Sequence, residues 1–205
     1  MDVLTEKSLL RWLCLSKLEE IKLFGKWSFG GVEVKDLGLK KYVYLKPLYV
    51  PHSMGRHEHK RFHKSKVNLV ERLVNDLMRP GRNAGKKVWA IGLVRNAFEI
   101  IYLRTKRNPI DVLVSAVENC APCEDTTRIS YGGVAYHLAV DISPQRRVDV
   151  ALRFLSEGAR KCSFGNARSL EECLAEELIL AANHNIKSYA VAKRHEMERI
   201  AQSSR

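Results

Sequence analysis

The segment VNLVERLVNDLM, residues 67–78, decides the fold class of this chain. Its apolar residues recur at steps of three and four and so line one face of a helix; they are Val67, Val70, Leu73, Val74 and Leu77. The following Met78-Arg79-Pro80-Gly81 ends this helix, because proline and glycine are poor helix formers. From here to the C-terminus the pattern stays mostly helical.

Further helices follow. One carries Ile91, Val94, Phe98 and Ile101 on one face, and the next carries Ile110, Leu113, Val114 and Val117. The latter opens with Asn108 as a helix cap and Pro109 at the first helical position. A later helix bears Val148, Ala151, Leu152, Leu155 and Ala159. Another starts with the capping box Ser169-x-x-Glu172, and a weaker helix spans about 187–201.

Between residues 124 and 141 the apolar period changes to two, which is typical of β-strands. Val134, Tyr136, Leu138 and Val140 alternate with small or polar residues, and Tyr131-Gly132-Gly133 supplies a turn. Two strands alone are marginally stable, so this arm leans on the helices or is held by a partner. We therefore predict a mainly α fold: a bundle of about six helices with a protruding β-hairpin arm.

Residues 1–50 are expected to form an irregular N-terminal extension, followed by the helical domain at 51–205. A short amphipathic segment spans Val3 to Ile21, and Pro47 and Pro51 exclude a long regular element after it. The apolar run Leu9–Leu15 is interrupted by Arg11 and is too short to span a membrane. Acidic Asp2 and Glu6 argue against a signal peptide, so we expect a cytosolic protein without a membrane partner.

The charge balance predicts a polyanionic partner. The chain of 205 residues carries 35 Lys and Arg against 23 Asp and Glu, a net charge of +12. Residues 52–66 hold five cations against Glu58, and residues 79–107 hold eight against Glu99. These two runs suit a phosphate backbone. Phe62, within the first run, either stacks on a base or anchors the run to the core.

A second basic pattern lies on the helix after Ser143-Pro144. Arg146, Arg153 and Arg160 are spaced by seven and share the side opposite Val148, Leu152 and Leu155. This side is either an ordinary solvated face or a surface that binds phosphate. Arginine at all three positions favours phosphate, because its planar fork grips phosphate in a bidentate manner.

Signals for enzymatic chemistry are weak. Gly81–Lys87 has one residue too few for a phosphate-binding P-loop and lacks its hydroxyl residue. The histidines at 52, 57, 59 and 63 lie among cations that would repel a metal ion. The C-x-x-C pair Cys120 and Cys123 has no second pair at zinc spacing, and five cysteines argue against a disulfide framework. We expect no enzyme, no metal and no cofactor.

Several motifs together resemble one ribosomal protein family, called number seven in bacterial small subunits and number five in eukaryotic ones. They are Val67–Met78 with Gly85-Lys86-Lys87, Val117-Glu118-Asn119 leading to Glu124–Arg128, Tyr131-Gly132-Gly133, Tyr136, Pro144, Arg146-Arg147 and Ala159-Arg160. The similarity spans roughly Phe24 to Arg205. Pro51-His52-Ser53, Gly55-Arg56 and Glu124–Ile129 resemble the eukaryotic or archaeal members. Residues 1–20 match nothing in the family.

The resemblance implies a structural protein bound to small-subunit rRNA, which nucleates assembly of the 3′ major (head) domain. Its arm would contact tRNA and mRNA at the exit site, and other small-subunit proteins would be its neighbours. The expected rRNA-binding residues are Arg56, Lys60, Arg61, Lys64, Lys66, Arg79, Arg82, Lys86, Lys87, Arg95, Arg104, Arg107, Arg146, Arg147 and Arg153. The expected arm residues facing tRNA and mRNA are Arg128, Tyr131, Gly132, Gly133, Tyr136 and His137.

The resemblance also implies a cytosolic small subunit and, in a eukaryote, passage through the nucleolus during assembly. The alternative hypothesis is a helical DNA-binding regulator, although no helix-turn-helix spacing is evident. A nucleic-acid-processing enzyme ranks third. A preference for RNA over DNA distinguishes the first two hypotheses.

Overall fold

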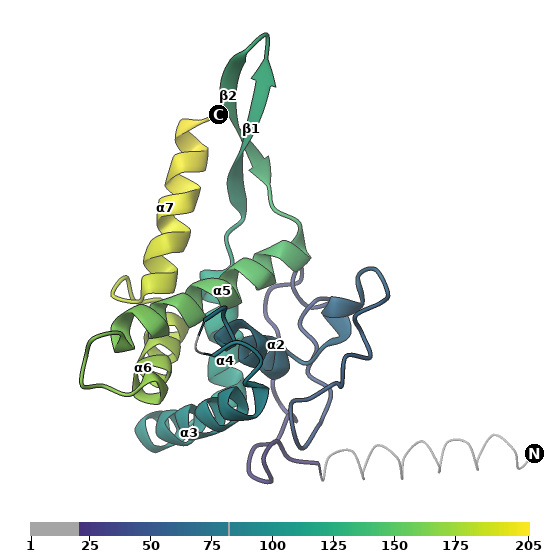
Figure 1. Ribbon diagram of the computed structural model, residues 1–205, viewed down its shortest axis with the longest axis vertical. Coiled ribbons are helices and arrows are strands. Elements are labelled where there is room, and N and C mark those ends of the chain that lie inside the picture. The colour runs from purple at the N-terminus through teal and green to yellow at the C-terminus, as the bar shows by residue number, and fades with distance from the viewer. Residues whose placement is uncertain (1–20, 82) are drawn as a thin grey trace, which may run out of the picture.

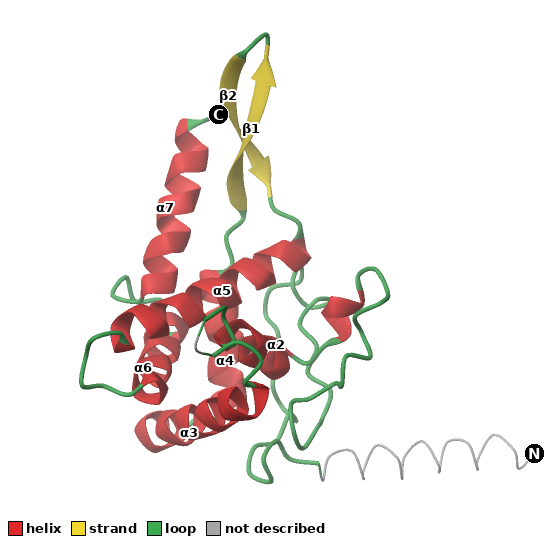
Figure 2. Cartoon of the chain, viewed as in Figure 1, coloured by secondary structure: helices red, strands yellow, loops and turns green. Residues whose placement is uncertain are grey.

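The computed structural model describes residues 21–81 and 83–205, and within them the chain is mainly helical (Figures 1 and 2). A 3-10 turn, η1 (His63–Lys66), precedes six helices, and two antiparallel strands interrupt them. The helices are α2 (Leu69–Leu77), α3 (Lys87–Thr105), α4 (Pro109–Cys120), α5 (Pro144–Ser163), α6 (Leu170–Ala182) and α7 (Tyr189–Ser203). The strands are β1 (Glu124–Tyr131) and β2 (Val134–Asp141). The expected fold class is confirmed.

Capping side chains set the helix starts that the sequence indicated. Asn108 Oδ1 accepts a hydrogen bond from the amide of Ile110 at 3.1 Å, with Pro109 opening α4. The hydroxyl of Ser169 accepts from the amide of Glu172 at 3.3 Å at the start of α6. Helix α2 begins two residues later than Val67, because Asn68 is its cap and accepts from the amide of Val70.

The bundle core is built mainly from α4 and the helices around it. Helix α4 packs against α5 and α6, and α6 also packs against α3. Leu113 and Val117 of α4, Leu152 of α5 and Leu178 of α6 are fully buried and belong to one apolar cluster. None of the helices in the described ranges is both long and apolar enough to cross a membrane.

Residues 21–50 are irregular, as expected, but they share this core. Leu23 and Leu39 are fully buried in the same cluster as the helices. The carboxylate of Glu118 in α4 accepts the amide of Lys35 at 2.6 Å and that of Asp36 at 3.1 Å. The expected domain boundary near residue 50 remains a prediction. The amphipathic segment expected from Val3 lies outside the described residues up to position 20.

The hairpin projects from the bundle, and its lower half lies beside α7 (Figure 1). Its strands pair from Glu124 with Asp141 to Tyr131 with Val134. Gly132 and Gly133 both have positive φ, which the tight turn between the strands requires. Glu198 of α7 accepts the amide of Cys123 at 3.1 Å, and Arg205 pairs with Glu124. The sequence predicted that the arm either leans on the helices or is held by a partner. The structure shows that it contacts α7, the last helix.

Candidate nucleic-acid interface

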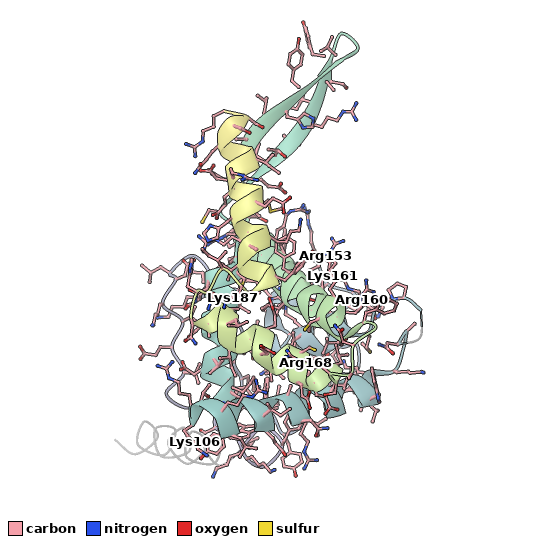
Figure 3. The ribbon with its side chains drawn as sticks, turned by 90° about the vertical axis from the view of Figure 1, so that its left-hand side faces the viewer. Lys106, Arg153, Arg160, Lys161, Arg168 and Lys187 are labelled. Carbon is pink, nitrogen blue, oxygen red and sulfur yellow. The ribbon has the colours of Figure 1, made fainter. Side chains whose placement is uncertain are left out.

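The outer side of α5 carries the arginines that the sequence placed there. Arg146, Arg153 and Arg160 are exposed, whereas Val148, Leu152 and Leu155 on the opposite side are fully buried. Figure 3 shows Arg153 and Arg160 along this helix, with Lys161 beside them. The expected one-sided arrangement is confirmed. Helix α5 thus presents a row of guanidinium groups to solvent, one per two turns.

A cleft of about 480 Å³ lies between this row and the basic loop, residues 52–66, which ends with η1. Its lining combines residues far apart in the chain: Arg61, Phe62, Ser143, Gln145, Arg146, Asp149, Val150 and Arg153. Phe62 is 65% exposed, so its ring is at the surface and does not anchor the basic loop to the core. Of the two readings of Phe62, the anchoring one is therefore wrong.

Three ion pairs hold the basic segments against the bundle. Lys64 and Arg72 both contact Asp149 Oδ1 of α5, at 2.8 and 2.7 Å. Arg72 is almost fully buried and also donates to the carbonyl of Tyr42 at 3.1 Å. Lys87 contacts the buried Glu71 at 2.6 Å. These contacts join η1 and α2 to α5, and α2 to α3.

Glu71 is the central acceptor of this arrangement. Its Oε1 atom also accepts the amide and the hydroxyl of Ser53, both at 2.8 Å. Burial opposes ionisation of Glu71, but the hydrogen bonds from Lys87 and Ser53 outweigh it and lower the pKa of the carboxyl. Glu71 therefore stays charged at neutral pH. Because its partners are 16 and 18 residues away, sequence reasoning missed its role.

The expected rRNA-binding residues differ in their freedom to meet a ligand. Arg147 has a side chain only 15% exposed; it contacts Asp36 at 3.1 Å and donates to the carbonyl of Pro122 at 3.1 Å. Arg79 and Lys87 are likewise partly buried. The exposed members are Arg56, Lys60, Arg61, Lys64, Lys66, Lys86, Arg95, Arg104, Arg107, Arg146 and Arg153. Arg82 lies outside the described residues.

The exposed cations do not form one continuous site. Arg61, Arg146 and Arg153 meet in the α5 cleft. Arg95, Arg104 and Arg107 belong to α3 and the turn after it, and Figure 3 shows the neighbouring Lys106 well apart from Arg153. The structure thus brings the first basic run to α5 and leaves much of the second on another side of the bundle.

A second groove, of about 580 Å³, lies near the C-terminal end of α5. It is lined by Leu77, Arg79, Pro80, Asn83, Arg160, Lys161 and Phe164. Phe164 is exposed, and Arg168 lies in the loop that follows. The seven-residue spacing indicated Arg160, but no pattern in the sequence singled out Lys161, Phe164 or Arg168.

The histidines of the basic loop do not gather into a cluster of three in the described part of the chain. No cluster of three or more metal-ligating side chains occurs among residues 21–81 and 83–205. The rings of His57 and His63 lie 5.9 Å apart between their centroids. Desolvation, followed by the charges of Lys66 and Lys60, lowers the pKa of His63. This side chain is therefore neutral at pH 7.

The arm differs from the rest of the surface in its charge and its polarity. Residues 124–141 hold one cation, Arg128, against three carboxylates. The strand register places Arg128 opposite His137 on one face. The other face is apolar and exposed, and it carries Ile129, Tyr131, Val134, Tyr136, Leu138 and Val140. Phosphate binding by the arm would therefore depend on Arg128.

Comparison with known proteins identifies relatives that match most of the chain. The family model for ribosomal protein S7p/S5e matches residues 39–205. The small ribosomal subunit protein uS7 of Methanothermobacter thermautotrophicus is 54% identical over 182 residues, covering 89% of this chain and 98% of that protein. The uS7 proteins of Methanosphaera stadtmanae and Archaeoglobus fulgidus are 53% and 51% identical; they cover 89% and 91% of this chain, and the matches span 98% and 96% of those proteins. The chain therefore belongs to the S7p/S5e family of ribosomal proteins.

Proposed function

We propose that this chain is a structural constituent of the small ribosomal subunit that binds the 3′ major (head) domain of small-subunit rRNA and nucleates assembly of the head. Membership of a ribosomal family supports the proposal, as does the net charge of +12. Neighbouring small-subunit proteins are the further partners, and the site of action is the cytosolic subunit, with nucleolar assembly in a eukaryote.

The observation that carries the RNA-binding part is the cleft beside α5. Arg61 and Arg146 come from segments 85 residues apart, and Arg153 adds a third guanidinium two turns further along the helix. Guanidinium groups bind phosphate in a bidentate manner, and each neutralised phosphate releases condensed counterions. The ion pair between Lys64 and Asp149 holds the basic loop against α5. A preformed site loses less entropy on binding than a flexible basic tail.

We propose a second contact, between the arm and both tRNA and mRNA at the exit site. The arm extends well beyond the bundle, and α7 supports its base (Figure 1). Arg128 and His137 form its polar face, and Tyr131 at the tip is 82% exposed. With a single cation available, contact with nucleotides would rely on aromatic stacking as much as on charge.

The test of the rRNA proposal is filter binding of the purified chain to a transcript of the 3′ major domain. The 5′ domain transcript and duplex DNA of equal length serve as controls. With about 6–10 phosphate contacts, affinity should fall roughly 10³–10⁵-fold between 50 and 200 mM salt. Equal affinity for duplex DNA would favour the regulator hypothesis and contradict the proposal.

A matched pair of variants locates the interface. Arg153→Gln, in the cleft, should weaken binding to the transcript and make the salt slope shallower by about one phosphate. Lys193→Gln removes the same charge from α7, where Lys193 pairs with Glu196, and should leave the slope unchanged. Identical behaviour of the two variants would show that α5 is not the interface.

The exit-site contact needs its own test. Arg128→Gln should reduce ultraviolet crosslinking between the arm and tRNA in reconstituted subunits, while the rRNA affinity of the free protein stays unchanged. Crosslinking of the variant at the wild-type level would contradict the arm proposal alone.

A further inference from the structure

The ring of Phe62 is held at the surface by its backbone. Its φ of 62° lies in the left-handed region, which bulky residues rarely adopt. The carbonyl of Phe62 accepts the hydroxyl of Ser65 at 2.8 Å and the amide of Ser65 at 3.3 Å. These bonds stabilise the turn that projects the ring, so its exposure is built into the loop.

The side chains around the Phe62 ring provide groups that can contact both the base and the phosphate of a nucleotide. The Arg61 guanidinium lies over one face of the ring, 5.0 Å from its centroid, which leaves the other face for a base. Arg146 and Arg153 line the same cleft. Ser143 and Gln145 add hydrogen-bonding groups, and Val150 adds an apolar surface. A base has apolar faces, a polar edge and a linked phosphate, and each of these has a counterpart here. The cleft volume of about 480 Å³ is in the range of small-molecule pockets.

The carboxylates at the cleft are paired within the protein. Asp125 lies beside the cleft, with its Oδ2 atom 3.6 Å from Arg146. Asp149 is contacted by both Lys64 and Arg72, so its charge is compensated within the protein. Ser143, at the start of α5, makes no capping hydrogen bond with its side chain. Among the described residues, its hydroxyl is therefore not committed to capping the helix.

We propose that the cleft beside α5 receives a single unpaired nucleotide of RNA, with its base stacked on Phe62 and its phosphates held by Arg146 and Arg153. Ser143 and Gln145 contact the edge of the base. This inference rests on the RNA-binding function proposed above and adds a base-recognition site to it. A purely electrostatic interface would need the arginines but not an exposed aromatic ring.

The experiment separates the base from the phosphates. Two fluorescent octamers are compared by anisotropy at 50 mM salt: octaadenylate and an abasic ribose-phosphate octamer of equal charge. The wild-type chain should bind octaadenylate about 5- to 140-fold more tightly, as expected for stacking of one base. Phe62→Leu keeps the apolar bulk but loses the aromatic face, and it should bind both octamers equally. Phe62→Tyr should behave as the wild type.

Tyr49→Leu is the matched control, because its ring is 62% exposed but does not line the cleft. This variant should keep the preference for octaadenylate. The inference is overturned if the wild type does not distinguish the octamers or if Phe62→Leu keeps the preference. It is also overturned if hexaglutamate displaces octaadenylate as effectively as free adenylate displaces it. Selective binding of the 3′ major domain transcript can still hold in each of these cases, so the two proposals fail separately.

Discussion

Replacement of Glu71 by glutamine tests the buried contact that joins the basic loop to α3. The Oε1 atom of Glu71 accepts three hydrogen bonds, two from Ser53 and one from the Lys87 ammonium group. Glutamine has the same shape and keeps one acceptor oxygen, so no cavity forms. What is lost is the negative charge opposite Lys87, whose side chain is 19% exposed.

The expected cost follows from this geometry. Breaking a buried ion pair by removing one partner costs about 3–5 kcal/mol. Because Lys87 reaches some water and the amide oxygen still accepts hydrogen bonds, we expect Glu71→Gln to lower the free energy of unfolding by about 2–3 kcal/mol. For a chain of this size, the melting temperature should fall by about 4–12 °C.

Thermal unfolding followed by circular dichroism at several pH values measures the effect. The pKa of Glu71 is lowered below its usual 4.5 in the fold, so its contribution is complete above pH 4.5 and is lost as the pH falls through the lowered value. The difference between wild type and variant should therefore shrink in acid. The control is Glu58→Gln, which replaces an exposed carboxylate of the basic loop. It should change the free energy of unfolding by less than about 0.5 kcal/mol. Equal melting of Glu71→Gln and wild type at pH 7 would refute the reasoning.

Three further predictions concern buried polar groups. Arg147→Met should lower the free energy of unfolding in urea by about 2 kcal/mol, because Asp36 and the Pro122 carbonyl lose their donor; no change would mean that these contacts contribute nothing. Burial raises the pKa of Asp76 to about 6, so Asp76→Asn should stabilise the fold at pH 7.5 by about 1–2 kcal/mol. That gain should shrink as the pH falls from 6 and vanish well below pH 3.8, where the carboxyl is protonated in both states; a gain independent of pH would contradict it. Burial raises the pKa of Cys120 to about 12 and that of Cys173 to about 11, so mass spectrometry should find both alkylated more slowly by iodoacetamide than the exposed Cys123 and Cys162. Equal rates of alkylation at all four of these cysteines would contradict this prediction.

The helices could be predicted because their signals are local. The cap at Asn108, the box from Ser169 to Glu172 and the two glycines of the hairpin act within a few residues of themselves. Periodicity also predicted which side of α5 would be buried. For these elements the tertiary structure agrees with the local preferences of the chain.

The candidate site was predictable in its charges but not in their pairing. The seven-residue spacing placed Arg146 on the outer side of α5, where it is exposed in the cleft, but no pattern indicated that Arg147 contacts Asp36, 111 residues away. Likewise, residues 21–50 lack periodicity, yet Leu23 and Leu39 are fully buried. Non-local contacts of this kind depend on how the elements pack, and a one-dimensional pattern does not carry that information.

The contacts of residues 21–50 also determine when this segment can settle during synthesis. The amides of Lys35 and Asp36 cannot bond to Glu118 until that residue, more than 80 positions later, has been synthesised. Likewise, the Asp36 carboxylate cannot pair with Arg147 until Arg147 has been synthesised. At about 5–20 residues per second, the delay before Arg147 is made is roughly 5–20 s. The apolar cluster that contains Leu23 and Leu39 also includes residues of α6 and α7, so it cannot be complete until those helices have been made. The first described part of the chain to be translated is thus among the last to be enclosed.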